Sequence, residues 1–297
     1  MTSSMPAALP AVAATGELGA AQIAQLKEWA LFVRLETIRL IGIAKVGHYA
    51  SAFSAAEIFA TLYYDTMRLR RGEPKWPDRD RFLMGKGHAA VGLFPILADW
   101  DFFPKDLLDG YTRLGNPLGD HPDVRKVPGI DFSSGSIGHA LSGGLGMALG
   151  ARLQAKDFNV YVLLGDGEMQ EGQVWEAAIS AAHHRARNLI AIVDRNGFQL
   201  DGRVDDIMGI EPLATKWRAF NWEVHEVDGH DVAALATLLR KIKADTARQT
   251  PICIIAHTTK GKGVSYMETE PGWHLGYLAP EDEALAIAEL KAGGGGA

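Results

Sequence analysis

Apolar positions follow two different periods along the chain. From residue 160 onward, short β-branched and apolar runs alternate with segments whose apolar residues fall at helical spacing. This alternation predicts an α/β fold, with a mostly parallel sheet and helices on both faces. The predicted strands cover residues 81–84, 160–164, 189–193, 222–227 and 251–256, and the predicted helices after residue 160 cover 173–183, 212–220 and 232–243.

The first half of the chain is predicted to be mainly helical. Apolar spacing from Gln22 to Val46 indicates a long helix, and Ser54-Ala-Ala-Glu57 has the capping-box pattern that would open another helix through Met67. Further helices are predicted over residues 89–99, 104–114 and 139–154. We expect a mobile tail over residues 1–19, one globular domain over 20–280, and a helix end with a Gly-rich tail over 281–297.

Composition narrows the function classes only moderately. The 297 residues are 47% hydrophobic and 22% charged, with a net charge of −6, which is ordinary for a globular protein and gives no reason to expect nucleic-acid binding. No apolar run reaches the roughly 18 residues of a membrane span. Cys253 is the one cysteine, so no intramolecular disulfide can form. We therefore expect a cytoplasmic protein in which Cys253 is a small core residue.

Two polar loops follow neighbouring predicted strands. Gly165-Asp166-Gly167 comes after strand 160–164, and Asn196 comes after strand 189–193, thirty positions beyond Asp166. One βαβ unit places both loops at the same sheet edge. The side-chain oxygens of Asp166 and Asn196, with a backbone carbonyl just beyond Asn196, could bind Mg²⁺ whose other ligands are water and phosphate oxygens. The glycines of the two loops allow a diphosphate to approach the backbone closely. A lone Gly-Asp-Gly would usually be only a turn; the pair is much more specific.

The fuller string Gly165-Asp-Gly-Glu-Met-Gln-Glu-Gly172, followed by Trp175-Glu-Ala177, resembles the thiamine diphosphate motif of transketolases. The resemblance extends from about residue 20 to residue 280. It implies the thiamine diphosphate-binding fold and the amino-terminal, diphosphate-binding half of such an enzyme. The implied reaction transfers a two-carbon ketol unit from a ketose phosphate to an aldose acceptor.

The same resemblance gives roles to four separate histidines. His48 and His274 would polarise sugar oxygens and shuttle protons, His121 would orient the donor, and His88 would contact the diphosphate. His88 also stands between a strand end and a predicted helix start, where an anion is favoured. After His48 this chain has Tyr49-Ala50 where the family usually has Pro-Gly, so the shape of that loop is not predicted.

The resemblance further implies which residues hold the cofactor and its metal. Thiamine diphosphate would contact His88, Gly135, Ser136, Ile137, Gly165, Asp166, Gly167, Glu168, Glu171, Asn196 and His274. Mg²⁺, or Ca²⁺ or Mn²⁺ in its place, would be held by Asp166, Asn196 and the backbone carbonyl of Phe198. Glu171 is expected at a subunit interface near the pyrimidine ring, supported by Glu176.

Two further groups of residues receive simpler interpretations. Gly143, Gly144 and Gly146 are predicted to serve close packing of their helix. Lys260 and Lys262 are predicted to be surface charges outside the site.

In the family, the carboxylate that activates the aminopyrimidine ring and most sugar-phosphate arginines belong to a second domain. Residues 281–297 are too few to contain it. We therefore expect a separate pyrimidine-binding chain in an α2β2 assembly that acts on sugar phosphates, with no nucleic acid or membrane partner. The sugar itself is not predicted. A role in pentose phosphate metabolism is expected from the resemblance, and a side pathway that uses an unusual ketose or acceptor stays open.

Two other functions stay open at this point. One is the α subunit of a 2-oxo-acid dehydrogenase first component, which shares the Gly-Asp-Gly signature; the histidines and the segment His257–Gly263 favour transketolase instead. The other is a cofactor-binding homologue without catalysis. The intact Asp166, Asn196 and His48 argue against it.

Overall fold

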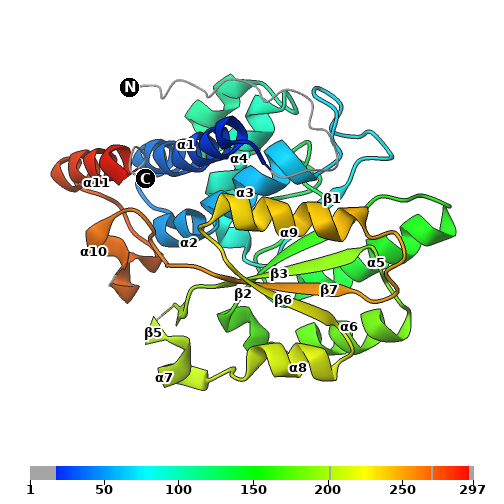
Figure 1. Ribbon diagram of the computed structural model, residues 1–297. Helices are drawn as coiled ribbons and strands as arrows, with labels where there is room; N and C mark the ends of the chain where they lie inside the picture. The colour runs from blue at the N-terminus through cyan, green and yellow to red at the C-terminus, as the bar shows by residue number, and fades with distance from the viewer. Residues whose placement is uncertain (1–17, 201, 269, 294–297) are drawn as a thin grey trace.

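The computed structural model describes residues 18–200, 202–268 and 270–293 (Figure 1). Most of the predicted tail, residues 1–17, and the last glycines, in residues 294–297, lie outside the described residues. The centre is one sheet whose neighbouring strands all pair in parallel. Its spatial order is β1 (Arg81–Met84), β2 (Val160–Gly165), β3 (Leu189–Arg195), β7 (Ile252–His257) and β6 (Glu223–Asp228).

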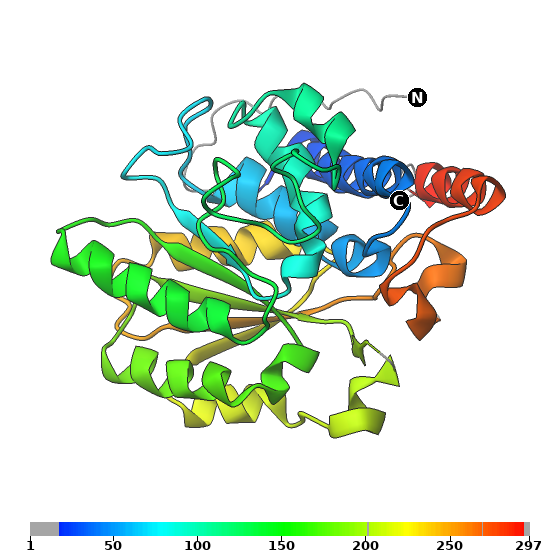
Figure 2. The same cartoon turned by 180° about the vertical axis from the view of Figure 1, so that it is seen from behind.

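Helices cover both faces of this sheet, as Figures 1 and 2 show. One layer contains α1 (Ala20–Ala44), α3 (Ala56–Thr61), α4 (Ala90–Asp99) and α9 (Val232–Ala244), and the other contains α5 (His139–Leu153), α6 (Gly172–His183) and α8 (Leu213–Ala219). Alternate strand residues enter the two cores: Leu163 packs in the first and Val162 in the second. The predicted α/β fold class is confirmed, and Cys253 is buried as expected.

The predicted capping box at Ser54 is wrong. The chain forms three consecutive helical pieces here, α2 (Tyr49–Ser54), α3 and the π-helical η1 (Leu62–Thr66). The Ser54 hydroxyl donates to the carboxylate of Asp194 at 2.6 Å. The Glu57 carboxylate pairs with Arg34 at 2.7 Å. Both side chains therefore make long-range contacts instead of capping a helix.

The predicted helix over residues 104–114 is also wrong. The chain forms a short 3₁₀ segment, η3 (Lys105–Gly110), and then a series of turns. The side-chain amide of Asn116 donates to the carbonyl of Leu107 at 2.9 Å, and its oxygen accepts from the backbone of Leu118 at 2.8 Å. Thr112 is left-handed, with φ 59°. Asn116 thus takes up a carbonyl that a continuing helix would use.

Several short elements were not predicted from the sequence. They are η2 (Gly87–Ala89), η4 (Gly167–Gln170), the antiparallel pair β4 (Phe198–Gln199) and β5 (Gly202–Arg203), α7 (Val204–Met208), α10 (Ser265–Glu268) and η5 (Pro271–His274). The predicted C-terminal helix end is a longer helix, α11 (Pro280–Gly293). No helix among the described residues combines the length and apolarity needed to cross a membrane.

Close packing explains two of the three glycines assigned to it in α5. A Cβ at Gly143 would lie 2.8 Å from the Phe132 ring, and one at Gly144 would lie 2.6 Å from Val162. A Cβ at Gly146 would meet no described atom within 4 Å, so the packing prediction is wrong for this residue.

Candidate active site

Four histidines from separate segments lie together at the carboxyl edge of the sheet. The ring centroid of His48 lies 5.1 Å from that of His88, 5.2 Å from His274 and 6.0 Å from His121, and His88 lies 5.1 Å from His274. A two-hydrogen-bond bridge between Gly47 and Gly276 holds the first and last of these segments together. The histidines predicted from separate sequence contexts therefore share one site.

Asp120 joins two of these histidines and was missed in the sequence. Its carboxylate lies 3.3 Å from Nδ1 of His48 and 3.4 Å from Nδ1 of His121, and it accepts a hydrogen bond from the Tyr111 hydroxyl at 3.3 Å. Burial raises the pKa of Asp120, but His48, His121 and Tyr111 together outweigh it, so the net pKa lies below the ordinary value. An ionised Asp120 favours the Nδ1–H tautomer of His48, which leaves Nε2 as an acceptor.

His88 and His274 are electrically neutral near pH 7. Burial, together with the Lys86 ammonium, holds the pKa of His88 well below its usual range. Burial and the Lys260 ammonium lower the pKa of His274 to about 3. A neutral imidazole can donate from one nitrogen and accept at the other. His274 can therefore polarise an oxygen or receive a proton.

The loops after β2 and β3 meet at Asp166. This carboxylate is 2% exposed and accepts hydrogen bonds from the backbone of Gly167 at 2.8 Å and of Gly197 at 2.5 Å. Gly197 has φ 79°, a conformation that glycine adopts without strain. Burial, and then the nearby Asp194, raise the pKa of Asp166 to about 6. A cation bound to this carboxylate would stabilise its ionised form and so lower its pKa again.

Asn196 and Phe198 lie in the second of these loops. The Asn196 side-chain oxygen accepts from the backbone of Phe198 at 3.1 Å, and the Gly197 contact with Asp166 brings this loop against the first. No three His, Cys, Asp or Glu side chains of the described residues form a metal-binding group. The predicted metal ligands are instead one carboxylate, one side-chain amide and one backbone carbonyl. Their oxygens are hard ligands of the type that Mg²⁺ prefers. These residues fit the predicted metal.

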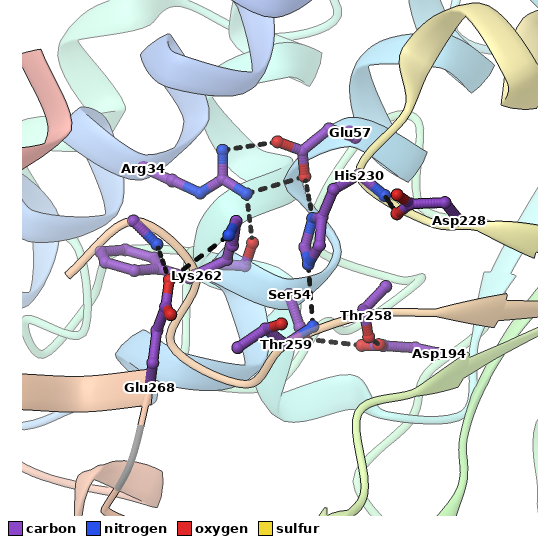
Figure 3. Close-up of polar contacts among 12 residues, drawn as sticks. Arg34, Ser54, Glu57, Asp194, Asp228, His230, Thr258, Thr259, Lys262 and Glu268 are labelled. Atoms are coloured by element: carbon purple, nitrogen blue, oxygen red, sulfur yellow. Dashed lines mark hydrogen bonds and ion pairs between the residues drawn. The ribbon is translucent and has the colours of Figure 1, made fainter. Parts of the chain in front are cut away.

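Asp194 belongs to a buried polar cluster, of which Figure 3 shows Asp194, Ser54 and Thr258. Asp194 accepts hydrogen bonds from Ser54 and Thr258 and forms an ion pair with Lys86. Burial raises the pKa of Asp194, but Lys86, with the hydroxyls of Ser54 and Thr258, outweighs this and holds the pKa below the ordinary value. Asp194 and Lys86 therefore form a buried ion pair near Asp166.

Lys260 is not a surface charge, so that prediction is wrong. The residue is 3% exposed, and its Nζ lies 5.8 Å from the centroid of the Phe198 ring. Burial, followed by repulsion from Lys86, lowers its pKa to about 8, while Asp166 and Asp194 act in the opposite direction. Lys262 is half-exposed and pairs with Glu268 at 3.6 Å, as a surface charge would. Lys260 thus adds a cation to the predicted diphosphate side.

The loop over residues 133–138 lies between His121 and the segment of His88. A Cβ at Gly87 would lie 2.5 Å from Oγ of Ser134, and a Cβ at Gly135 would lie 3.4 Å from the His121 ring. The buried Oγ of Ser134 has no hydrogen-bond partner in the described part of the chain. Ser136 is exposed and Ile137 half-buried. The loop therefore has an unpaired hydroxyl oxygen, and its glycine would let a cofactor come close to the backbone, at the place where the cofactor was predicted to bind.

Glu168 braces this loop. Its buried carboxylate accepts from the backbone of Gly138 at 2.7 Å and of Gly165 at 3.0 Å, and burial raises its pKa to about 7. A Cβ at Gly85 would lie 2.1 Å from this carboxylate. Direct contact of Glu168 with a cofactor stays a prediction. Glu171 and Glu176 are exposed, so their predicted place at an interface also stays a prediction.

A second buried network positions the segment that contains Lys260. His230 Nδ1 lies 3.0 Å from the Glu57 carboxylate, and its Nε2 accepts from the backbone N–H of Thr259 at 2.8 Å (Figure 3). Glu57 is also bound by both terminal nitrogens of Arg34, each at 2.7 Å. The residue next to Lys260 is thereby tied to helices α1 and α3.

Comparison with known proteins identifies this arrangement. The family described as transketolase, thiamine diphosphate binding domain, matches residues 26–291. One subunit of the apulose-4-phosphate transketolase of Phocaeicola vulgatus is 38% identical over 258 residues, 87% of this chain and 91% of that protein. 6-Deoxy-6-sulfo-D-fructose transketolase subunit SqwG of Clostridium sp. is 39% identical over 266 residues, 90% of this chain and 96% of that protein.

Solved structures give the same result. Transketolase from Campylobacter jejuni superposes with a TM-score of 0.84 at 27% identity, and that from Leishmania mexicana with 0.83 at 29%. Both alignments cover 91% of this chain but only 43% and 41% of those chains. The matches confirm the predicted family and do not favour the 2-oxo-acid dehydrogenase alternative. The chain therefore belongs to the transketolase family and represents its N-terminal, thiamine diphosphate-binding part.

Proposed function

We propose that this chain is the diphosphate-binding subunit of a two-chain transketolase, which transfers a two-carbon ketol unit from a ketose phosphate to an aldose. The observation that carries the proposal is the convergence of His48, His88, His121 and His274 beside the Asp166 loop. The test is whether ketol transfer depends on both this chain and a pyrimidine-binding chain. A 2-oxo-acid decarboxylase activity would contradict it.

Each polar group has a proposed part in binding. Asp166, Asn196 and the Phe198 carbonyl hold Mg²⁺, for which Mn²⁺ or Ca²⁺ can substitute, and His88 and Lys260 face the diphosphate. Gly135, Ser136 and Ile137 hold the pyrimidine side. Bound thiamine diphosphate would supply the electron sink for carbon–carbon cleavage.

The remaining histidines act on the sugar. His48, oriented by Asp120, accepts a proton at Nε2. His274 is neutral, so it can hydrogen-bond the donor or acceptor oxygen and exchange a proton with it. His121 is half-exposed, as a residue that meets an entering donor would be.

A separate partner chain is supported by the relatives. Two proteins named as transketolase subunits are matched over 91% and 96% of their own lengths. Their names give apulose 4-phosphate and 6-deoxy-6-sulfofructose as sugars, which makes phosphorylated or sulfonated ketoses the substrate class to test. The α2β2 assembly, the cytoplasmic location and a role in pentose phosphate metabolism stay predictions.

Metal affinity should depend on pH through Asp166. Its pKa is raised to about 6, so below that pH a proton competes with the metal for the carboxylate. We expect Mn²⁺ affinity, measured with bound thiamine diphosphate, to fall about tenfold for each pH unit below that value. The Mn²⁺ affinity of free thiamine diphosphate over the same range corrects for the cofactor's own titration. A flat corrected profile would contradict Asp166 as a ligand.

Replacing Lys260 tests the diphosphate side separately. Lys260→Met should weaken thiamine diphosphate binding roughly tenfold, because a charge-assisted contact is lost. Lys262→Met is the matched control, since Lys262 lies in the same loop but pairs with Glu268. Calorimetric titration measures the affinity of both variants for thiamine diphosphate. Equal losses of affinity in the two variants would contradict a contact between Lys260 and the diphosphate.

A further inference from the structure

A second cavity, of about 580 Å³, lies at the amino ends of the strands, on the opposite edge of the sheet from the histidines. Asn159 and Asn188, which directly precede β2 and β3, line it, as does the segment 245–249 before β7. In Figure 1 the strands run from this edge toward α2 and α10. The volume is that of a small-molecule site.

The lining of this cavity is strongly basic in an acidic protein. Seven Arg and Lys side chains line it against three Asp, whereas the whole chain has a net charge of −6. The basic residues are Arg68, Arg152, Lys156, Arg185, Arg187, Lys243 and Arg248. Such a concentration of one sign inside a concave site attracts the opposite charge.

Most of these cations are held in place without being neutralised. Two have carboxylate partners: Arg68 pairs with Asp157 at 2.7 Å, and Lys156 pairs with Asp78. Arg152 and Arg187 instead donate to backbone carbonyls, each at 2.8 Å. These bonds fix the guanidinium groups but leave their charge uncompensated.

Two arginines show most clearly that positive charge at the cavity is not compensated by carboxylates. Within the part of the chain that the structure describes, Arg248 donates to the carbonyls of Arg187 and Ile242 and to no carboxylate, and burial lowers its pKa below the ordinary value. The Arg185 side chain makes no hydrogen bond or ion pair with any residue that the structure describes, and it is exposed beside the cavity.

Helix ends account for only part of this charge. Helices α5, α6 and α9 end at the cavity, and their terminal carbonyls favour cations. Each helix end is equivalent to roughly half a negative charge, and Asp78 pairs with Lys156 from outside the lining, so together they offset about two and a half of the four excess positive charges. A positive excess of about one and a half remains, which is close to the charge of a phosphate monoester near pH 7.

We propose that this cavity binds a small phosphorylated anion, at a site separate from the thiamine diphosphate site. Guanidinium groups match phosphate oxygens in paired hydrogen bonds, and several of them converge here from different segments. Three helix ends and the sheet edge border the cavity, and its volume suits a small molecule better than an extended polymer.

The test uses the full chain with thiamine diphosphate and Mg²⁺ at the same concentrations in cell and syringe, so that the cofactor site is filled. The probe is glycerol 3-phosphate, a phosphate monoester, titrated calorimetrically at low ionic strength. The cavity variant Arg152→Glu/Arg185→Glu reverses two exposed charges, and Arg125→Glu/Lys291→Glu makes the same net change elsewhere on the surface. Thiamine diphosphate binding by all three proteins checks their folding.

We expect the wild-type chain to bind one equivalent of probe and the cavity variant to bind it at least about tenfold more weakly. The control variant should change the affinity less than twofold, and added salt should weaken binding to the wild-type chain. Absence of binding by the wild-type chain, or equal losses in both variants, would overturn the proposal. The basic residues would then serve only to neutralise the helix ends.

Discussion

Asp166→Asn is expected to weaken Mg²⁺-dependent thiamine diphosphate binding by at least about a hundredfold. Residues that merely orient metal ligands cost about ten- to a hundredfold when removed, and Asp166 is proposed to be a ligand itself. The substitution also places an amide NH₂ against the backbone N–H groups of Gly167 or Gly197, which both donate to the carboxylate. Calorimetric titration with thiamine diphosphate and Mg²⁺ measures the loss.

The control for this change is Asp206→Asn. Asp206 is exposed in the neighbouring helix α7, so the same loss of charge should leave cofactor affinity nearly unchanged. Circular dichroism would show that both variants keep the fold. Wild-type affinity in Asp166→Asn would rule out the proposed metal site.

Glu57→Ala is expected to lower the free energy of unfolding by about 3–5 kcal/mol, because it leaves the buried Arg34 guanidinium unpaired. Burial alone would raise the pKa of Glu57, but Arg34 and His230 lower it to about 2. A lowered pKa contributes stability that is present above the ordinary value of 4.5 and is lost as pH falls toward about 2. The wild-type chain should lose this contribution in that range and the variant should not.

Asp123→Ala is the matched control for Glu57. Asp123 pairs with Arg125 at 3.2 Å, but Arg125 is exposed and solvent screens the pair, so we expect a much smaller loss than for Glu57→Ala. Urea unfolding of both variants gives the comparison. Similar losses would mean that the Arg34–Glu57 pair contributes no more than a surface pair.

The features that could be predicted from sequence are those encoded locally. Strands β2, β3 and β7 are mainly continuous apolar runs, so their positions and parallel pairing follow from pattern and connection. His48, His88, His121 and His274 each stand in a short motif, and the motifs keep their order along the chain. The structure adds that their rings come together.

The features that could not be predicted depend on distant partners. Asp120 gains its role from His48, 72 positions away, and Lys86 is buried because Asp194, 108 positions away, neutralises it. Lysine is usually exposed, so nothing in the local sequence around Lys260 indicates that its loop turns it inward. Ser54 and Glu57 gave a wrong prediction for the same reason. Their spacing is that of a local helix cap, but in the structure their side chains bind the distant residues Asp194 and Arg34.

The most direct test of the two-chain account is a ketol-transfer assay with thiamine diphosphate and Mg²⁺. Xylulose 5-phosphate, apulose 4-phosphate and 6-deoxy-6-sulfofructose would be supplied as donors with a panel of aldose acceptors. We expect one donor to lose two carbons and one acceptor to gain them only when this chain is mixed with a pyrimidine-binding transketolase chain. Sustained transfer by this chain alone, or release of carbon dioxide from a 2-oxo acid by the mixture, would contradict it.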